Sequence, residues 1–455
     1  MNKTFLDLAK TYGPVFQVQI GDRRCVVVCG HKTIREATSG AKGFDFAARP
    51  DFKSYENFGK FGEPGYLAEH RYYKKLTLQA MELFGSHRRS DLQEIAYKAV
   101  DAIMDEIKLR KGEPFDPKDT LYSCAWIIVG FICYGPEFDH TDPEVVEIQR
   151  ITPIFAKAVA VGVLWDFMAW TKWITKPLMK ENVELMKKID ELSFKLAAKN
   201  FETWDGTSTR TVADMFRKAG KELREEDDVK TTKEHLKYVN ISDKELQSML
   251  TSLFGAGFAT VATQVRWALF WMAKNPDIQA KVHEELDNVI GSTGSPTIDD
   301  QQRLPFCTAV MTEVYRISSM SAMGISHATT RNTELLGFKI PAETPVMLNL
   351  FSAHYDPAVF PNPTKFDPYR FFDSDSCQVR KEKMELVMPY GHGLRRCGGE
   401  LIAKTEIFLF FVSIMQQCSV EPGQGELLDP ENYICALGID LKSFKIRFLS
   451  RNGVW

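Results

Sequence analysis

A single cysteine framed by glycines and arginines, directly ahead of an apolar helix, is the feature that most constrains this chain. The stretch reads Tyr390-Gly-His-Gly-Leu-Arg-Arg-Cys397-Gly-Gly-Glu400, and residues 401–415 show helical apolar spacing. The start of a helix carries partial positive charge and two arginines precede the cysteine, so both effects favour a thiolate. The glycines leave room for a flat cofactor to approach the backbone. A thiolate facing a large planar metal complex is the ligand of oxygen-activating haem; the alternative is a surface loop with a free thiol.

Composition allows a large buried core and gives no sign of a nucleic-acid partner. The chain has 455 residues, 44% of them hydrophobic, and a formal net charge of -3. Its nine cysteines are irregularly spaced and form no Cys-x-x-Cys pair. This pattern favours a reducing compartment over a disulfide framework.

Apolar segments are too short for a membrane span of ~18–20 residues, and no secretory signal opens the sequence. Residues 156–174 are rich in aromatic and aliphatic side chains but are interrupted by Asp166 and Lys172. They suit either a membrane surface or a buried helix pair that covers a pocket.

Periodicity predicts a mainly helical single domain with a minor β part. Alternating apolar residues predict a hairpin at 15–20 and 25–29, and helical spacing dominates residues 91–290. A long helix is expected over 243–273, ended by Asn275-Pro276, with another helix up to residue 290. The remaining expectations are an exposed, mobile, charged connection at 221–237, strands near 334–340 and 345–350, and a β-rich C-terminal segment.

The cysteine stretch resembles the haem-binding signature of the cytochrome P450 family. That signature has an aromatic residue, a glycine two residues before a basic residue, and then the cysteine followed by glycine. The resemblance implies that Cys397 is the axial ligand of the haem iron and that Arg395 contacts a haem propionate. Tyr390 stands where phenylalanine is usual.

Further motifs follow in the family's order. Glu313-Val-Tyr-Arg316 resembles the Glu-x-x-Arg motif, whose spacing puts both charges on one helix face. Arg370 lies in a segment that resembles the one whose arginine joins this pair, so a buried network of three charges is implied; the alternative is an exposed ion pair of little energetic value. His327 stands where related microsomal enzymes place a histidine against a propionate, and its alternative is a satisfied core histidine.

Residues 254–263 resemble the family's oxygen-activation helix. Gly257 and Ala256 would let the helix pass close to a flat ring, and Thr260 would place a hydroxyl near the iron. The family usually has an acid before this threonine, but here Ala259 can relay no proton. Either coupling is impaired or the reaction differs. Phe258 is the expected substrate contact, on the helix face beside the iron.

A second departure lies upstream, where the family usually has tryptophan and, four residues on, arginine against a propionate. His70 and Lys74 occupy these positions. Both can donate hydrogen bonds to a carboxylate, although lysine lacks the bidentate fork of arginine. The alternative is a solvated basic helix face.

The resemblance covers nearly the whole chain, so residues 1–455 are expected to form one cytochrome P450 haem domain. It is strongest to the microsomal animal branch, with its steroid hydroxylases and arene-oxidising enzymes; that branch's N-terminal anchor and hinge are not expected here. The family implies insertion of one oxygen atom from O2 into a small apolar substrate: a steroid, a lipid or an aromatic xenobiotic. It implies NADPH-cytochrome P450 reductase as electron donor, admits cytochrome b5 as another, and implies the cytoplasmic face of the endoplasmic reticulum membrane.

Two other functions stay open. Ala259 is compatible with a haem-thiolate isomerase or dehydratase that acts on hydroperoxides, whereas Thr260 favours the monooxygenase. A non-catalytic haem-binding protein is the other alternative, and it would form no product from any substrate.

Overall fold

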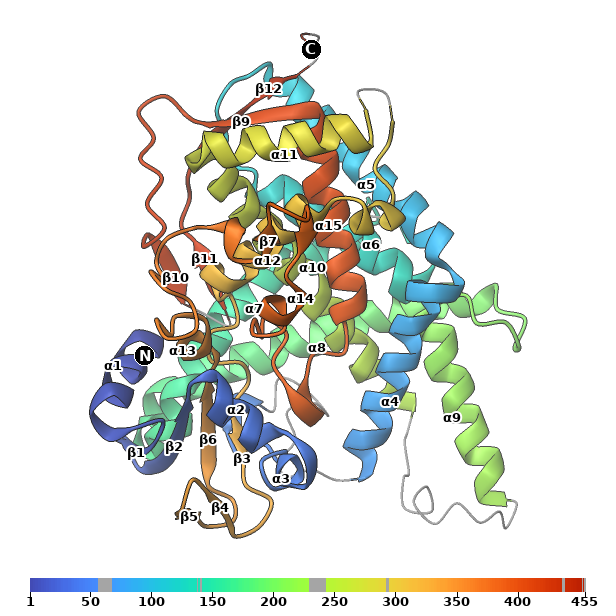
Figure 1. Cartoon of the computed structure of the whole chain (residues 1–455). Helices are drawn as coiled ribbons and strands as arrows, with labels where there is room; N and C mark the ends of the chain where they lie inside the picture. Colours follow the sequence, from blue (N-terminus) through green and yellow to red (C-terminus); the bar gives the residue numbers. More distant parts are fainter. Residues whose placement is uncertain are drawn as a thin grey trace.

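The computed structural model describes residues 1–55, 68–136, 138–139, 141–228, 243–291, 294–435, 438–451 and 453 (Figure 1). Helices make up most of it, which confirms the mainly α class with a minor β part. The longer helices are α1 Asn2–Tyr12, α4 Ala68–Glu82, α5 Arg89–Arg110, α6 Lys118–Tyr134, α7 Pro143–Phe167, α8 Lys172–Glu202, α9 Val212–Asp228, α10 Asp243–Lys274, α11 Pro276–Val289, α12 Pro305–Ser318 and α15 Glu400–Gln417. The shorter ones are α2 His31–Thr38, α3 Gly40–Asp45, α13 Leu350–His354 and α14 Lys381–Met384.

Helix α10 runs through the largest apolar cluster and contacts α6, α12 and α15. Its side chains from Val261 to Ala273 are buried. It ends at Lys274 because Asn275-Pro276 cannot continue a helix, and Pro276 instead opens α11. The predicted end of this helix is confirmed to within one residue.

The four-stranded sheet, at the lower left of Figure 1, has the order β1-β2-β6-β3, from β1 Val15–Ile20, β2 Arg23–Cys29, β6 Pro345–Asn349 and β3 His327–Ala328. The predicted hairpin is confirmed, since β1 and β2 pair antiparallel from Val15 with Val28 to Ile20 with Arg23. Strand β6 joins β2 in parallel. Beyond it, Ala328 of β3 bridges to Ala48, which brings residues 46–49 beside His327.

The other strands form two-stranded sheets. They are β4 Thr333–Leu335 with β5 Phe338–Ile340, β7 Phe372–Asp373 with β8 Gln378–Val379, β9 Cys418–Pro422 with β12 Ile446–Ser450, and β10 Tyr433–Cys435 with β11 Ile439–Leu441. The predicted strands near 334–340 and 345–350 and the β-rich C-terminal segment are therefore present.

The prediction of an exposed, mobile connection at 221–237 is wrong for its first part, which is helical. Residues 221–228 continue α9, and residues 229–237 lie outside the described residues. Val212, Ala213, Phe216 and Ala219 are buried at helical spacing, so this apolar face anchors the helix despite the charge that follows it.

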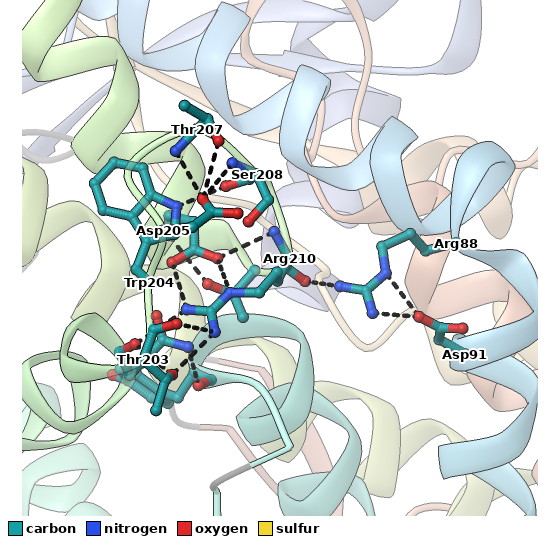
Figure 2. A network of polar contacts seen from close by, with 12 residues as sticks. Arg88, Asp91, Thr203, Trp204, Asp205, Thr207, Ser208 and Arg210 are labelled. Atoms are coloured by element: carbon teal, nitrogen blue, oxygen red, sulfur yellow. Dashed lines mark hydrogen bonds and ion pairs between the residues drawn. The ribbon is translucent and has the colours of Figure 1, made fainter.

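The turn between α8 and α9 is held by the polar network of Figure 2. The Arg210 guanidinium donates to Asp214 Oδ2 at 3.0 Å and to Thr203 Oγ1 at 2.9 Å. Its backbone oxygen accepts from Arg88 of the segment before α5. One arginine therefore joins the ends of three helices.

Within the described part of the chain, none of the helices combines the length and the apolar content that a membrane span requires.

Candidate functional site

Cys397 lies in the loop that leads into α15. The 3₁₀ turn Gly393–Arg395 precedes it, and its amide donates to the backbone oxygen of Tyr390 at 2.9 Å. Gly399 is the N-terminal cap of α15, whose first residue is Glu400, so the cysteine stands three residues ahead of the helix. The sulfur is thus placed near the positive end of α15, as the sequence predicted.

The glycines of this loop serve two different purposes. Gly393 has φ of +74°, and a Cβ there would lie 2.0 Å from the Thr38 backbone oxygen. A Cβ on Gly398 would lie 2.7 Å from Thr77 Cγ2. Gly391 and Gly399, in contrast, have nothing within 4 Å of an added Cβ. Two glycines therefore allow the loop to pack closely, and the other two have open space beside them.

The charge state of Cys397 depends on opposing effects. Although Cys397 is exposed to solvent, the protein atoms packed around its sulfur raise the pKa of the thiol, whereas the Gly399 N–H and the positive charges of Lys74 and Arg396 lower it. The helix start and the arginine therefore act in the expected direction, and they reduce the upward shift of the pKa without reversing it. A bound metal ion deprotonates a coordinating thiol and would therefore favour the thiolate form of Cys397.

Basic groups gather beside this loop from distant parts of the chain. Arg395 Nε donates to the Ala47 backbone oxygen at 2.7 Å. His327 Nδ1 lies 2.7 Å from the Phe46 backbone oxygen, and since a carbonyl only accepts, Nδ1 carries the hydrogen. Burial, with the nearby Arg49 charge, lowers the pKa of His327 to about 3, so the ring is neutral.

Arg49, to which the sequence reasoning gave no role, is the most informative of these groups. It is 7% exposed, and its Nη1 donates to the backbone oxygens of Ile325 and Ser326 at 2.9 and 3.0 Å. Its Nε has no acceptor, and among the described residues no carboxylate pairs with it. Because a buried cation without a counter-charge is costly, Arg49 favours the binding of an anion beside it. The sequence feature that points to a buried charge here is an arginine within the apolar stretch Phe-Ala-Ala-Arg49-Pro.

Lys74 reaches the same region from α4. Its Nζ donates to the backbone oxygen of Arg396, and burial lowers the pKa of the amine. His70 belongs to α4, but its side chain lies outside the described residues.

Helix α10 presents a small exposed band in an otherwise buried element. Gly255, Ala256 and Thr260 are exposed, although Phe254 and Val261 beside them are buried. Thr260 Oγ1 donates to the Ala256 backbone oxygen at 2.9 Å. Ala259, the residue in the acid position, is half-buried against the main apolar cluster. The band gives a flat group room to lie against the helix.

Phe258 and Gly257 do not lie where the sequence reasoning put them. Phe258 is 3% exposed and packs against Trp126 of α6, with ring centroids 4.4 Å apart. Two residues are 200° apart on an α-helix, so Phe258 and Thr260 point in nearly opposite directions. Gly257 likewise faces α6, since a Cβ on it would lie 2.9 Å from Val129. Phe258 therefore packs against α6 and does not belong to the exposed band of α10, and its role as a substrate contact stays a prediction.

The structure brings Glu313, Arg316 and Arg370 together in the core. Arg316 binds the Glu313 carboxylate through Nε and Nη2 at 2.6 and 2.7 Å, and both residues are fully buried. Arg370 Nε lies 3.5 Å from Glu313 Oε1. Arg316 Nη1 also donates to the His354 backbone oxygen at 2.9 Å, which ties the network to α13.

Comparison with known proteins identifies the family of this chain. The family model for cytochrome P450 matches residues 1–448. The chain belongs to the cytochrome P450 family. Cytochrome P450 1A1 of Opsanus tau is 30% identical over 440 residues, covering 94% of this chain and 82% of that relative. Cytochrome P450 1A1 of Oryzias latipes is 32% identical over 436 residues, covering 93% and 82%.

Membership makes the protein a haem-containing P450 monooxygenase, and the relatives belong to the animal microsomal branch that the sequence resembles. The residues fit the cofactor. Cys397 is exposed, Gly391 and Gly399 of its loop have open space beside them, the buried Arg49 has an Nε without an acceptor, and α10 exposes a band of small residues.

Proposed function

We propose that Cys397 is the axial ligand of the haem iron and that the protein inserts one atom of O2 into a small apolar substrate. Cys397 stands ahead of α15 with its amide fixed by Tyr390 and with Gly399 and Lys74 beside its sulfur. When bound, the haem supplies the iron chemistry that activates oxygen. The observation that carries the proposal is the conjunction of this cysteine with the unpaired, buried Arg49.

The two carboxylates of the haem would be held by basic groups from four segments. Arg49 offers an Nε without an acceptor, and Arg395 and Lys74 add positive charge. His327 already donates through Nδ1 to a backbone oxygen, so its Nε2 could donate to a carboxylate only if the ring gained a proton. A nearby carboxylate favours that proton. His70, whose side chain lies outside the described residues, precedes Lys74 by one helical turn on α4, and we propose the same role for it.

Thr260 and Ala259 would govern the delivery of protons. The Thr260 hydroxyl is exposed on the open band of α10 and keeps oxygen lone pairs free to accept from water. Ala259 offers no titratable group, so solvent ordered by Thr260 has to bring in protons. The retained threonine supports a monooxygenase over a hydroperoxide isomerase.

The proposed substrate is a steroid, a lipid or an aromatic xenobiotic, and the small residues on the exposed band of α10 are compatible with such a molecule. Gly255 and Ala256 bring only small side chains to the exposed band, so a flat or elongated apolar molecule could approach Thr260 closely. The electrons would come from NADPH through NADPH-cytochrome P450 reductase, with cytochrome b5 as a further donor.

We place the protein at the cytoplasmic face of the endoplasmic reticulum membrane, and an exposed apolar patch supports contact with a membrane surface. Trp170, Trp173 and Ile174 at the α7–α8 turn are 62%, 76% and 70% exposed. Tryptophan is favoured at the membrane interface. This accords with the membrane-surface interpretation of residues 156–174 as far as residues 170, 173 and 174 are concerned; the side chains of residues 156–163 lie outside the described residues.

The reduced protein with carbon monoxide tests the proposal. It is expected to show the Soret shift typical of thiolate ligation, and Cys397→His is expected to lose that band while binding haem. A wild-type spectrum typical of histidine ligation, or no bound haem, would contradict the proposal. Turnover of a steroid, fatty acid and arene panel with reductase and NADPH then identifies the substrate class; a non-catalytic haem binder would give no product.

A further inference from the structure

The side chain of His354 connects the buried charge network to the loop that carries Cys397. His354 is the last residue of α13 and is 1% exposed. Its Nδ1 lies 2.7 Å from Ser319 Oγ, and its Nε2 lies 2.8 Å from the Met388 backbone nitrogen. Its own backbone oxygen accepts from Arg316. His354 is therefore hydrogen-bonded to Arg316 and Ser319 on one side and to Met388, which precedes the cysteine loop, on the other.

Each ring nitrogen of His354 has one fixed role. The Met388 N–H can only donate, so Nε2 is the unprotonated acceptor. Nδ1 then carries the hydrogen and donates to Ser319 Oγ, whose own hydroxyl donates to the Arg316 backbone oxygen at 3.0 Å. Burial, together with the Arg316 charge, lowers the pKa of His354 to about 3, so the ring stays neutral near pH 7.

Ser319 adopts a left-handed backbone conformation, which is unfavourable for residues other than glycine. It follows the last residue of α12 with φ of 39° and ψ of 42°, in the left-handed region. Glycine is the usual residue there because it has no Cβ. Glycine would lack the hydroxyl, however, and the hydroxyl is what bridges Arg316 and His354. The strain is therefore accepted where a polar contact is needed.

On the other side, Met388 leads into the cysteine loop. Its backbone oxygen accepts from the Gly391 N–H at 3.2 Å, which closes a tight turn. Within that turn, the backbone oxygen of Tyr390 accepts from the Cys397 amide at 2.9 Å. Met388 is 4% exposed, so its N–H has no water to replace a lost acceptor. The position of this turn therefore determines where the backbone of Cys397 lies.

We propose that His354 is a positioning residue for the thiolate ligand: by accepting the Met388 N–H it fixes the turn that sets the backbone of Cys397, and so the approach of the sulfur to the haem iron. The inference rests on the proposed role of Cys397 as axial ligand. It assigns His354 no contact with haem or substrate.

Two substitutions distinguish the hydrogen bond at Nε2 of His354 from the one at Nδ1. His354→Gln can place an acceptor oxygen near the position of Nε2 and keep the Met388 bond. His354→Asn is one bond shorter, so it can keep a donor toward Ser319 but cannot reach Met388. The readout is the spectrum of the reduced, carbon monoxide-bound protein: the fraction in the thiolate-type Soret band, and the rate at which that band is lost on incubation.

His354→Gln is expected to lose the thiolate band at a rate within about twofold of the wild-type rate. His354→Asn is expected to lose it roughly tenfold faster, because one buried hydrogen bond that is not made corresponds to a ratio of this size. His283→Gln, at a half-buried histidine on α11, is the matched control and should leave the band unchanged. Far-ultraviolet circular dichroism records whether each variant is folded.

The outcomes separate the two proposals. If the wild type lacks the thiolate band, Cys397 is not the ligand and the proposed function fails. If the wild type has the band and both His354 variants keep it equally, the positioning role is overturned. It is also overturned if folded Gln and Asn variants lose the band equally. Should His354→Asn not fold, His354→Leu replaces it, since leucine fills the space but offers the Met388 N–H no acceptor: a faster loss of the band than in His354→Gln supports the proposal, and an equal rate overturns it.

Discussion

At the scale of single residues, Arg49 and Ala259 have the clearest consequences for the site. Arg49 is a buried cation whose contacts within the described residues are backbone oxygens. Ala259 occupies the position of an acid in a helix that otherwise keeps the small residues and the threonine of the family. One residue has a charge without a partner, and the other lacks a charge where the chemistry uses one. Both can be tested by a single substitution.

Arg49→Met is expected to weaken the retention of haem. Removing one member of a buried charge pair costs about 2–5 kcal/mol, which corresponds to a rise of roughly thirtyfold or more in the haem dissociation rate. Transfer of haem to a scavenging protein measures that rate. The control is Arg331→Met, which removes an exposed arginine paired with Asp45 in the same neighbourhood. Equal rates in the two variants would show that Arg49 does not hold a propionate.

Ala259→Asp is expected to raise the fraction of NADPH that is converted to product. A positioned carboxyl group supplies the proton that alanine cannot, and general acid catalysis of this kind makes a gain of roughly severalfold or more reasonable. Product formed per NADPH consumed is the measurement. Ala259→Asn has the same shape without the acid and should show no gain. Unchanged coupling in the aspartate variant would mean that proton delivery does not pass through this position.

At the scale of helices and strands, local signals located the elements but not their partners. The end of α10 was predictable because Pro276 acts on its immediate neighbours. The face of Phe258 was not, since it depends on α6, more than 100 residues earlier in the chain. Arg49 was missed for the same reason: its acceptors belong to Ile325 and Ser326. Cys397 was predictable because glycines, arginines and helix are all adjacent in sequence.

The α8–α9 turn gives a prediction at this scale. Arg210→Ala is expected to lower the free energy of unfolding by about 2–4 kcal/mol, because it leaves the fully buried Asp214 carboxylate without its cation. Urea unfolding followed by circular dichroism measures the change. Lys199→Ala removes an exposed ion pair with Asp142 and should cost less than about 1 kcal/mol. Similar losses in the two variants would argue against the network of Figure 2 as the clamp between these helices.

At the scale of the whole molecule, several buried histidines couple folding to pH. Burial, with nearby positive charge, lowers the pKa of His354 to about 3 and that of His283 to about 4. An unfolded chain binds protons at these histidines below their usual pKa of about 6.5, whereas the folded chain does not. Their contribution to stability is therefore complete above about pH 6.5 and is lost progressively as the pH falls toward the folded-state values.

His283 allows this coupling to be tested away from the haem site. Its Nε2 donates to the Cys418 backbone oxygen at 3.2 Å, a bond that a glutamine amide can reproduce without titrating. His283→Gln is therefore expected to make the decline in stability between pH 6.5 and pH 4 shallower. One fully buried histidine contributes about 1.4 kcal/mol per pH unit, and partial exposure of His283 reduces its share to a fraction of that. Urea midpoints at half-unit pH intervals give the slope. His87→Gln, at an exposed histidine, is the control, and a slope in His283→Gln as steep as in that variant would assign the acid sensitivity to other groups.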